Sequence, residues 1–331
     1  MRPRWAVHTG AMHRRSEPRP ATASIAVRTA IRCLLLLWLA AAACAAAAQE
    51  LASSLREEVL MVTKPGAFAL DLETTLFRPP GDGPHPLVII NHGKAAGNPR
   101  FQSRARYLPA VREFVRRGYA VVIPMRQGFS KSTGSYIGGG CNVASNGLVQ
   151  AEDVKLVLEQ FAARADIDAT RVVVLGQSHG GLTTLALGAC LANVVGLVNF
   201  AGGLRNDGCT AWEQTLARAV GSYGKDTAVP SLWFYGDNDS YFQPWLWRDM
   251  HARYTEAGGR ARLVAFGNFG SDSHAMFGSR EGLPVWLPEV EKFFRELGLP
   301  FEAKHVFAPP AEMPAAHRLY AAQGSALRPK E

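Results

Sequence analysis

The sequence predicts an α/β fold in which a mostly parallel sheet of about eight strands carries helices on both faces. Apolar, strand-like runs alternate with helix-like patterns, an order that implies right-handed crossovers between parallel strands. The clearest junction is RVVVLGQSHGG at residues 171–181, where an apolar strand runs through a turn of small residues into a helix. With 331 residues, 47% of them hydrophobic, the chain is long enough for one large domain of this class.

Residues 1–48 have the pattern of a secretory signal peptide. They contain seven arginines, no lysine and a single acidic residue. A short apolar core at residues 33–39 follows the last arginine, and the alanines at 46–48 form the expected cleavage site. We therefore expect cleavage after residue 48 and a periplasmic or secreted mature protein.

Some properties of this leader stay open. An uncleaved anchor is disfavoured because residues 33–48 are few and mostly alanine, so we expect no stable membrane span after cleavage. Cys44 is a candidate lipidation site, and either Met1 or Met12 could be the start of translation. The leader accounts for most of the formal net charge of +8, which makes nucleic acid an unexpected partner.

Beyond the leader, strands are predicted in this order: residues 58–63, 68–77, 87–91, 119–124, 172–176, 194–200, 231–235 and 261–266. Helices are predicted at residues 98–117, 149–164, 182–191, 212–219, 245–256 and 287–297. The first two strands look like an antiparallel pair closed by Pro79-Pro80-Gly81. We expect the folded domain to occupy residues 49–300, and residues 301–331 to form a loosely attached extension rich in alanine and proline.

The turn after the fifth strand has the form of a nucleophile elbow. The motif G-x-S-x-G places Gly176 and Gly180 where the crowded backbone leaves no room for side chains. Ser178 is then left with its hydroxyl at the carboxyl edge of the sheet. A solvated serine in a small-residue turn is the alternative, so the interpretation depends on catalytic partners further along the chain.

A serine hydroxyl is a poor nucleophile near neutral pH and needs a base within hydrogen-bonding reach. His274 follows the last strand and precedes the last helix, in the loop where such a base is expected. Apart from His179 next to the serine, the other histidines beyond the leader fall in a predicted helix, in the tail or early in the chain: His251, His305, His317, His85 and His92.

The base in turn needs an acid to orient it, and two aspartates follow the seventh strand. Asp239, three residues past Gly236, can turn back toward the His274 loop, so we favour it over Asp237. Either aspartate could instead cap the next helix. Asp272 is a third candidate.

The developing oxyanion needs fixed donors, and two backbone N–H groups suit this role. One belongs to His179, at the start of the helix that follows the serine, where the helix dipole also helps. The other belongs to Lys94, in the turn after the third strand, where Gly93 permits close approach. The side chains of His179 and Lys94 are expected to face the pocket or solvent.

This order of serine, aspartate and histidine resembles the α/β-hydrolase superfamily, most closely its dienelactone-hydrolase-like group. Residues 124–134 are similar to the R-G-x-G-x-S-x-G loop common there, with Gln127 and Ser130 as departures. The resemblance covers about residues 55–298. It implies hydrolysis through an acyl-enzyme, without a metal or an organic cofactor. Ser178 stands where the namesakes use cysteine, which favours ester chemistry over dienelactone as substrate.

Export permits a disulfide, and three cysteines remain beyond the leader. Cys141 and Cys209 lie in loops that follow strands and should meet at one edge of the sheet, so we predict that they pair. Cys190 lies on the helix after the serine and is expected to be a buried apolar residue.

The substrate pocket is expected to be open, since residues 201–230 leave room only for a small cap. Trp212, Tyr223 and the loop at 130–141 could form its walls. We predict an exported serine hydrolase that cleaves small-molecule carboxylic esters. A serine peptidase of the same fold and a catalytically silent binding protein stay open as alternatives, and the sequence does not indicate an oligomeric state.

Overall fold

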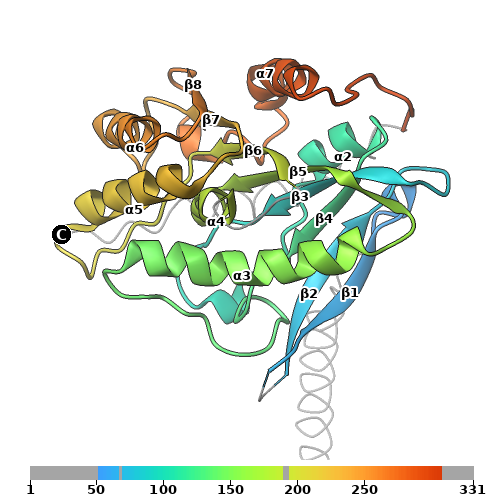
Figure 1. The fold of residues 1–331 in the computed structure, drawn as a ribbon, viewed down its shortest axis with the longest axis horizontal. Coiled ribbons are helices and arrows are strands. Elements are labelled where there is room, and N and C mark those ends of the chain that lie inside the picture. Colours follow the sequence, from blue (N-terminus) through green and yellow to red (C-terminus); the bar gives the residue numbers. More distant parts are fainter. Residues whose placement is uncertain (1–50, 67–68, 189–193, 308–331) are drawn as a thin grey trace, which may run out of the picture. The chain divides into compact units, whose positions relative to one another are not determined.

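The structure, a computed structural model, describes residues 51–66, 69–188 and 194–307. It centres on one eight-stranded sheet with the order β1-β2-β4-β3-β5-β6-β7-β8 (Figure 1). The pairs β1–β2 and β2–β4 are antiparallel and all the others are parallel. The predicted fold class is therefore confirmed. The predictions for the leader, including Cys44, and for Cys190 lie outside the described residues.

The observed strands overlap all eight predicted segments, although β5 begins five residues earlier than predicted. They are β1 (Glu58–Lys64), β2 (Leu70–Phe77), β3 (His85–Asn91), β4 (Ala120–Pro124), β5 (Ile167–Gln177), β6 (Val194–Phe200), β7 (Ser231–Tyr235) and β8 (Ala261–Ala265). One detail of the prediction is wrong. Lys64 pairs with Leu70, so the chain reverses between these two residues, and Pro79-Pro80-Gly81 instead leads from β2 to β3.

Helices cover both faces of the sheet, and each face has its own core. The helices are α2 (Leu108–Val115), α3 (Val143–Ala162), α4 (His179–Gly188), α5 (Trp212–Asp226), α6 (Pro244–Glu256) and α7 (Leu283–Glu296). One core contains residues of α3 to α6, and the other contains residues of α2 and α7 (Figure 1). Successive residues of β5 alternate between them, with Val172 and Val174 in the first and Val173 and Leu175 in the second.

The predicted helix at 98–117 is mostly wrong. Its first part is a single 3-10 turn, η2 (Pro99–Phe101), and α2 begins only at Leu108. Pro99 and Pro109 explain this division, because proline lacks an N–H and is tolerated only in the first turn of a helix. Tyr107 also adopts a left-handed conformation with φ 43°, which separates the two pieces.

Among the other helices, α3 and α7 differ most at their starts, which lie six and four residues earlier than predicted. The side chain of Asn142 accepts a hydrogen bond from the Ser145 N–H and so caps α3 at Val143. Similarly, α7 starts at Leu283 with a proline in its first turn. Two further 3-10 turns, η1 (Ser53–Leu55) and η3 (Ser273–Ala275), complete the elements.

The segment after residue 300 is not loosely attached where the structure describes it. The Phe301 side chain is buried, and its carbonyl accepts a hydrogen bond of 2.9 Å from Arg117. The backbone N–H groups of Lys304 and His305 donate to the carbonyl of Arg116. The described domain thus continues past the predicted boundary, and residues 308–331 lie outside the described part.

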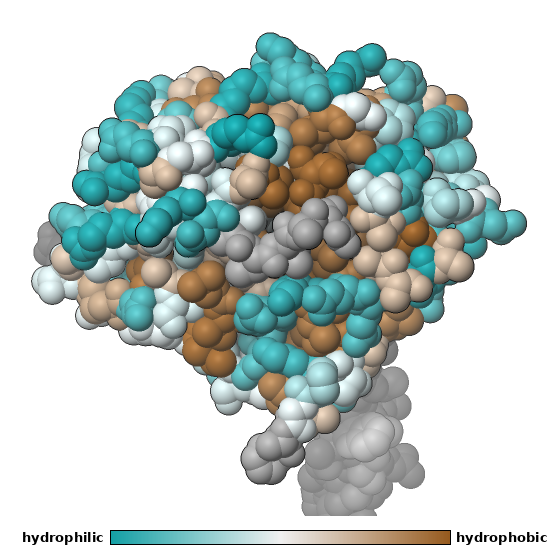
Figure 2. All heavy atoms as spheres, in the orientation of Figure 1, coloured by the Kyte–Doolittle hydropathy of each residue, from teal (hydrophilic) through white to brown (hydrophobic). Residues whose placement is uncertain are grey.

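Figure 2 shows hydrophilic and apolar areas side by side on the face in view. Within the described ranges, no helix is both long and apolar enough to cross a membrane.

Candidate active site

The turn between β5 and α4 has the strained geometry of an elbow. Ser178 has a positive φ of 57°, and its N–H donates to the Phe200 carbonyl of β6 at 3.0 Å. A Cβ on Gly176 would overlap the backbone of Gly180, and one on Gly180 would overlap the Asn91 carbonyl. The two glycines of the motif are therefore required by backbone contacts on both sides of the serine.

The loops after β7 and β8 bring His274 and Asp239 together. Asp239 Oδ2 lies 3.0 Å from His274 Nδ1, and the aspartate side chain is fully buried. Its other oxygen accepts the backbone N–H groups of Tyr241 at 2.8 Å and Phe242 at 3.0 Å. An ionised carboxylate only accepts hydrogen bonds, so Nδ1 carries the imidazole proton and Nε2 has a free lone pair.

The two other candidate acids lie elsewhere. Asp237 is exposed and lies 3.8 Å from Arg248, in a weak surface ion pair. Asp272 does not contact the imidazole, although it accepts the backbone N–H of His274 at 2.9 Å. It also accepts the N–H of Ser240 at 3.1 Å and its hydroxyl at 2.6 Å. Asp272 therefore cross-links the loop of the base to the loop of the acid.

A side-chain amide ties the histidine loop to the elbow. Gln177 Nε2 donates to the His274 carbonyl at 2.8 Å, and Gln177 directly precedes the serine. No hydrogen bond joins the Ser178 hydroxyl to the imidazole in the described residues. Such bonds are often long in ligand-free sites and tighten when substrate binds. The structure thus forms the Asp–His half of the predicted triad and places its loop beside the serine.

The two predicted oxyanion donors are open. Gly93 packs against the elbow, since a Cβ there would lie 3.2 Å from the Cβ of Ser178. Among the described residues, neither the N–H of Lys94 nor that of His179 donates to a protein acceptor. His179 is the first residue of α4, where an N–H has no partner within the helix and the dipole favours negative charge.

The expectation that the His179 side chain faces pocket or solvent is wrong. The ring is buried, with Nε2 2.7 Å from Asn146 Oδ1 and Nδ1 3.2 Å from Arg126 Nη2. Burial and the nearby Arg126 charge hold the pKa of His179 well below its usual value. Lys94 is half-buried, and its ammonium bonds the carbonyls of Ala95 and Gly97. Burial lowers the pKa of Lys94.

Two site residues were missed at the level of sequence. Besides Gln177, Tyr107 contributes a buried hydroxyl that donates to Gln177 Oε1 at 2.9 Å and accepts the N–H of Gly93 at 3.3 Å. Burial raises the pKa of Tyr107 to about 12, so it stays a neutral donor. The only signal available for Gln177 was its position next to the serine, and nothing in the sequence indicated Tyr107.

The aromatic walls differ from the expectation. Tyr223 is buried between helices, where its hydroxyl donates to the Ala144 carbonyl at 2.8 Å, so it belongs to the core. Tyr241, by contrast, is exposed, and its ring lies 4.5 Å from that of His274. Trp212 packs beside Phe242 at 6.4 Å.

Residues 69–245, more than half of the chain, match the protein family described as X-Pro dipeptidyl-peptidase (S15 family). The chain belongs to this family. No curated protein matches the chain.

Among solved structures, a putative dienelactone hydrolase from Klebsiella pneumoniae is similar with a TM-score of 0.54 and 18% identity over 72% of this chain and 99% of its own. The Pyrococcus furiosus esterase Pf2001 has a TM-score of 0.53 and 15% identity, over 74% and 94%. A Mycobacterium tuberculosis puromycin-hydrolyzing peptidase has a TM-score of 0.54 and 18% identity, over 76% and 41%. The resemblance to the α/β-hydrolase superfamily is therefore confirmed, and the S15 match makes the chain a hydrolase of this fold.

A disulfide joins two loops of the domain. It joins Cys141 and Cys209, whose Cα atoms are 5.5 Å apart, and so links the loops that precede α3 and α5. Asn206 reinforces this link by donating to the Gly140 carbonyl at 2.7 Å.

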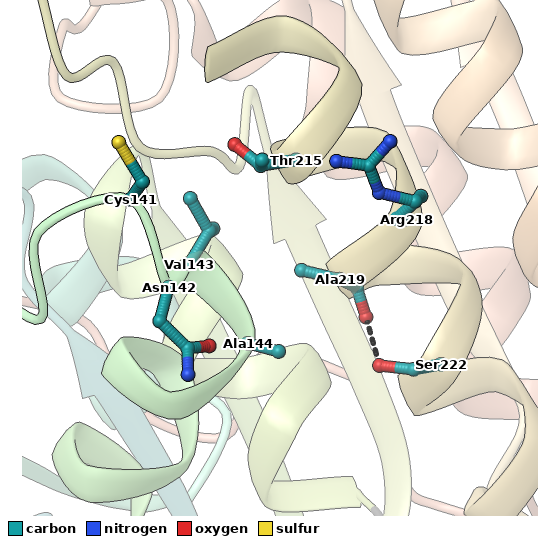
Figure 3. A pocket seen from close by; sticks show the side chains of 8 residues that line it. All are labelled: Cys141, Asn142, Val143, Ala144, Thr215, Arg218, Ala219 and Ser222. Atoms are coloured by element: carbon teal, nitrogen blue, oxygen red, sulfur yellow. Dashed lines mark hydrogen bonds between the residues drawn. The ribbon is translucent and has the colours of Figure 1, made fainter. Parts of the chain in front are cut away.

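A cavity of about 520 Å³ opens beside this disulfide, between α3 and α5 (Figure 3). None of the three residues of the predicted triad lines it. Its lining consists of Cys141, Asn142, Val143, Ala144, Thr215, Arg218, Ala219 and Ser222. Across the described residues, no group of three or more His, Cys, Asp or Glu side chains is arranged to hold a metal ion.

Proposed function

We propose that this chain is an exported serine hydrolase that cleaves carboxylic esters of small molecules through an acyl-enzyme. The observation that carries the proposal is the contact of 3.0 Å between His274 Nδ1 and the buried carboxylate of Asp239. This contact leaves Nε2 free as a general base, on a loop that is hydrogen-bonded to the residue before Ser178.

In the proposed reaction, Ser178 Oγ attacks the ester carbonyl while its proton passes to His274 Nε2. The carbonyl oxygen becomes negative and accepts the N–H groups of Lys94 and His179. Collapse of the tetrahedral intermediate expels the alkoxide, which takes the proton from Nε2. Water, activated by the same nitrogen, then releases the acid and restores the serine hydroxyl.

Export is supported by the composition of residues 1–48 and by the disulfide between Cys141 and Cys209. Disulfides persist in oxidising compartments such as the bacterial periplasm and are rare in the cytosol. The proposed location is therefore the periplasm or the extracellular space.

Peptide cleavage is the second candidate, and the S15 family match favours it. The same triad chemistry releases an amine instead of an alcohol. The two candidates differ in which acyl substrates give the higher kcat/KM, so a panel of p-nitrophenyl esters, lactones and dipeptide amides separates them.

The central experiment compares the wild type with Ser178→Ala and His274→Ala. Each substitution should abolish turnover, and Ser178→Ala should also abolish labelling by a fluorophosphonate probe. Ser145→Ala is the matched control, because Ser145 is exposed and only its backbone N–H is hydrogen-bonded among the described residues. This variant should be labelled by the probe and should hydrolyse substrate at the wild-type rate. Near-normal rates in Ser178→Ala would falsify the proposal, and absence of labelling in the wild type would favour a silent binding protein.

A further inference from the structure

Arg126 is a buried cation with an unusual set of partners. It follows β4, its side chain is fully buried, and no carboxylate pairs with it among the described residues. Its guanidinium donates instead to Gln150 Oε1 at 3.0 Å and to the His92 carbonyl at 2.8 Å. A buried charge without an ion pair costs stability. Burial lowers the pKa of Arg126 to about 10, and the nearby Asp153 carboxylate offsets only part of this shift. Stability alone therefore does not account for an arginine here.

One nitrogen of this guanidinium bridges the two segments that carry the oxyanion donors. Nη2 contacts the His92 carbonyl at 2.8 Å and His179 Nδ1 at 3.2 Å. His92 directly follows β3 and lies two residues before Lys94, whereas His179 is the first residue of α4. The bridge thus joins segments that are far apart in sequence at the point where their N–H groups must converge.

The direction of each hydrogen bond shows how Arg126 orients these segments. Arginine only donates, so His179 Nδ1 accepts, and Nε2 must carry the proton that is donated to Asn146 Oδ1 at 2.7 Å. The backbone N–H of Arg126 likewise donates to His92 Nε2 at 3.3 Å. Both rings are thereby neutral, each held in one tautomer.

The tautomer of His92 determines a hydrogen bond to the peptide unit that carries the Lys94 N–H. Since Nε2 accepts from Arg126, Nδ1 carries the proton and donates to the Gly93 carbonyl at 2.8 Å. Gln102 Nε2 donates to the same oxygen at 2.9 Å. This carbonyl shares a planar peptide unit with the Lys94 N–H, so fixing the oxygen fixes the direction of the N–H.

We propose that Arg126 is a positioning residue that aligns both oxyanion donors, through the His92 carbonyl and ring on one side and the His179 ring on the other. The inference rests on the proposed function, because the donors matter only if a tetrahedral intermediate forms at Ser178. It adds a residue that touches neither substrate nor the reacting atoms.

The test compares Arg126→Met and Arg126→Lys with the wild type. Both should lower kcat by roughly 10- to 100-fold while KM changes by less than about twofold, because donor alignment acts on the transition state. Arg126→Lys should not restore the wild-type kcat, since an ammonium on a flexible side chain cannot replace the planar guanidinium and its fixed donors. Binding of 2,2,2-trifluoroacetophenone, which the serine converts to an anionic hemiketal, should weaken by the same factor as kcat.

Arg117→Met and Arg117→Lys are the matched controls. Arg117 is also buried, but it pairs with Glu113 and the Phe301 carbonyl and leaves the oxyanion segments untouched. These variants should keep the wild-type kcat at a temperature where they are folded. Folding of every variant is checked by thermal unfolding, and Arg126→Lys decides the matter if Arg126→Met does not fold.

The outcomes separate this inference from the proposed function. Folded Arg126 variants with wild-type kcat, with an unchanged affinity for the ketone, or with losses matched by the Arg117 variants would overturn the positioning role. Activity that survives in Ser178→Ala would instead overturn the proposed function itself.

Discussion

Two aspartates only two residues apart meet different environments after β7. Asp239 is fully buried and receives two backbone N–H groups and the imidazole, whereas 46% of the Asp237 side chain is exposed. A carboxylate shielded from water interacts more strongly with a developing imidazolium than one screened by solvent. Burial, rather than distance along the chain, therefore separates the two candidates.

This difference predicts unequal effects of two matched substitutions. Asp239→Asn should lower kcat by roughly 10³- to 10⁴-fold, because the amide favours the wrong tautomer of His274 and cannot stabilise its cation. The kcat of Asp237→Asn should stay within about twofold of the wild-type value, since an exposed ion pair contributes little free energy. Steady-state kinetics on a p-nitrophenyl ester measures both. Equal losses in the two variants would contradict the assignment of Asp239.

The contact between His274 and Asp239 could be predicted from sequence because the two residues stand in loops that follow neighbouring parallel strands. Gln177 and Tyr107 could not, because their roles arise from contacts with loops far away in the sequence. The burial of His179 was missed for the same reason. Its partners Asn146 and Arg126 come from two other segments.

At the scale of elements, the loops after β7 and β8 act as one unit. Asp272 accepts three hydrogen bonds that cross-link them, from the Ser240 N–H, the Ser240 hydroxyl and the His274 N–H. Partial burial alone would raise the pKa of Asp272, but these bonds outweigh it and lower the pKa below its usual value. The charged form is thus favoured by folding.

Asp272→Ala should therefore destabilise the protein in a pH-dependent way. A carboxylate with a depressed pKa contributes stability that is complete above its unfolded pKa of about 3.9 and is lost as the pH falls through the folded value. The melting temperatures of wild type and variant should differ at pH 5–7 and converge below about pH 4.

Two observations check this interpretation of Asp272. Asp207→Ala, at a carboxylate that is 73% exposed, should leave the melting temperature nearly unchanged at every pH. Asp272→Ala should also lower kcat by about tenfold through misplacement of the imidazole. A stability difference that persists unchanged at pH 3 would argue against the role of the charge.

Element boundaries show where sequence patterns are reliable. Buried parallel strands such as β4 and β6 could be predicted because they are short, nearly continuous apolar runs bounded by turn residues. The predicted helix at 98–117 was wrong because Pro109 lies inside it, where a proline starts a new helix, and because Tyr107 is left-handed. A conformation of this kind at a non-glycine residue leaves no mark in the sequence.

At the scale of the whole molecule, the described segment after residue 300 packs against the helices on one face of the sheet. The Phe301 ring packs against Phe114 of α2 and Phe294 of α7, and it lies 4.5 Å from the Arg117 guanidinium. The alanine-rich composition of residues 301–331 gave no sign of this contact, because it depends on a single aromatic residue. Val306, five residues further on, is fully exposed.

Phe301→Ala should therefore lower the free energy of unfolding by about 3 kcal/mol or more, the usual cost of removing a buried aromatic ring. Val306→Ala, the matched control in the same segment, should change it by less than about 0.5 kcal/mol. Denaturant unfolding followed by tryptophan fluorescence measures both values. Ester hydrolysis by folded Phe301→Ala should persist at 25 °C, because none of the triad residues contacts the ring. If the two substitutions proved equally mild, the segment after residue 300 would not be part of the folded domain.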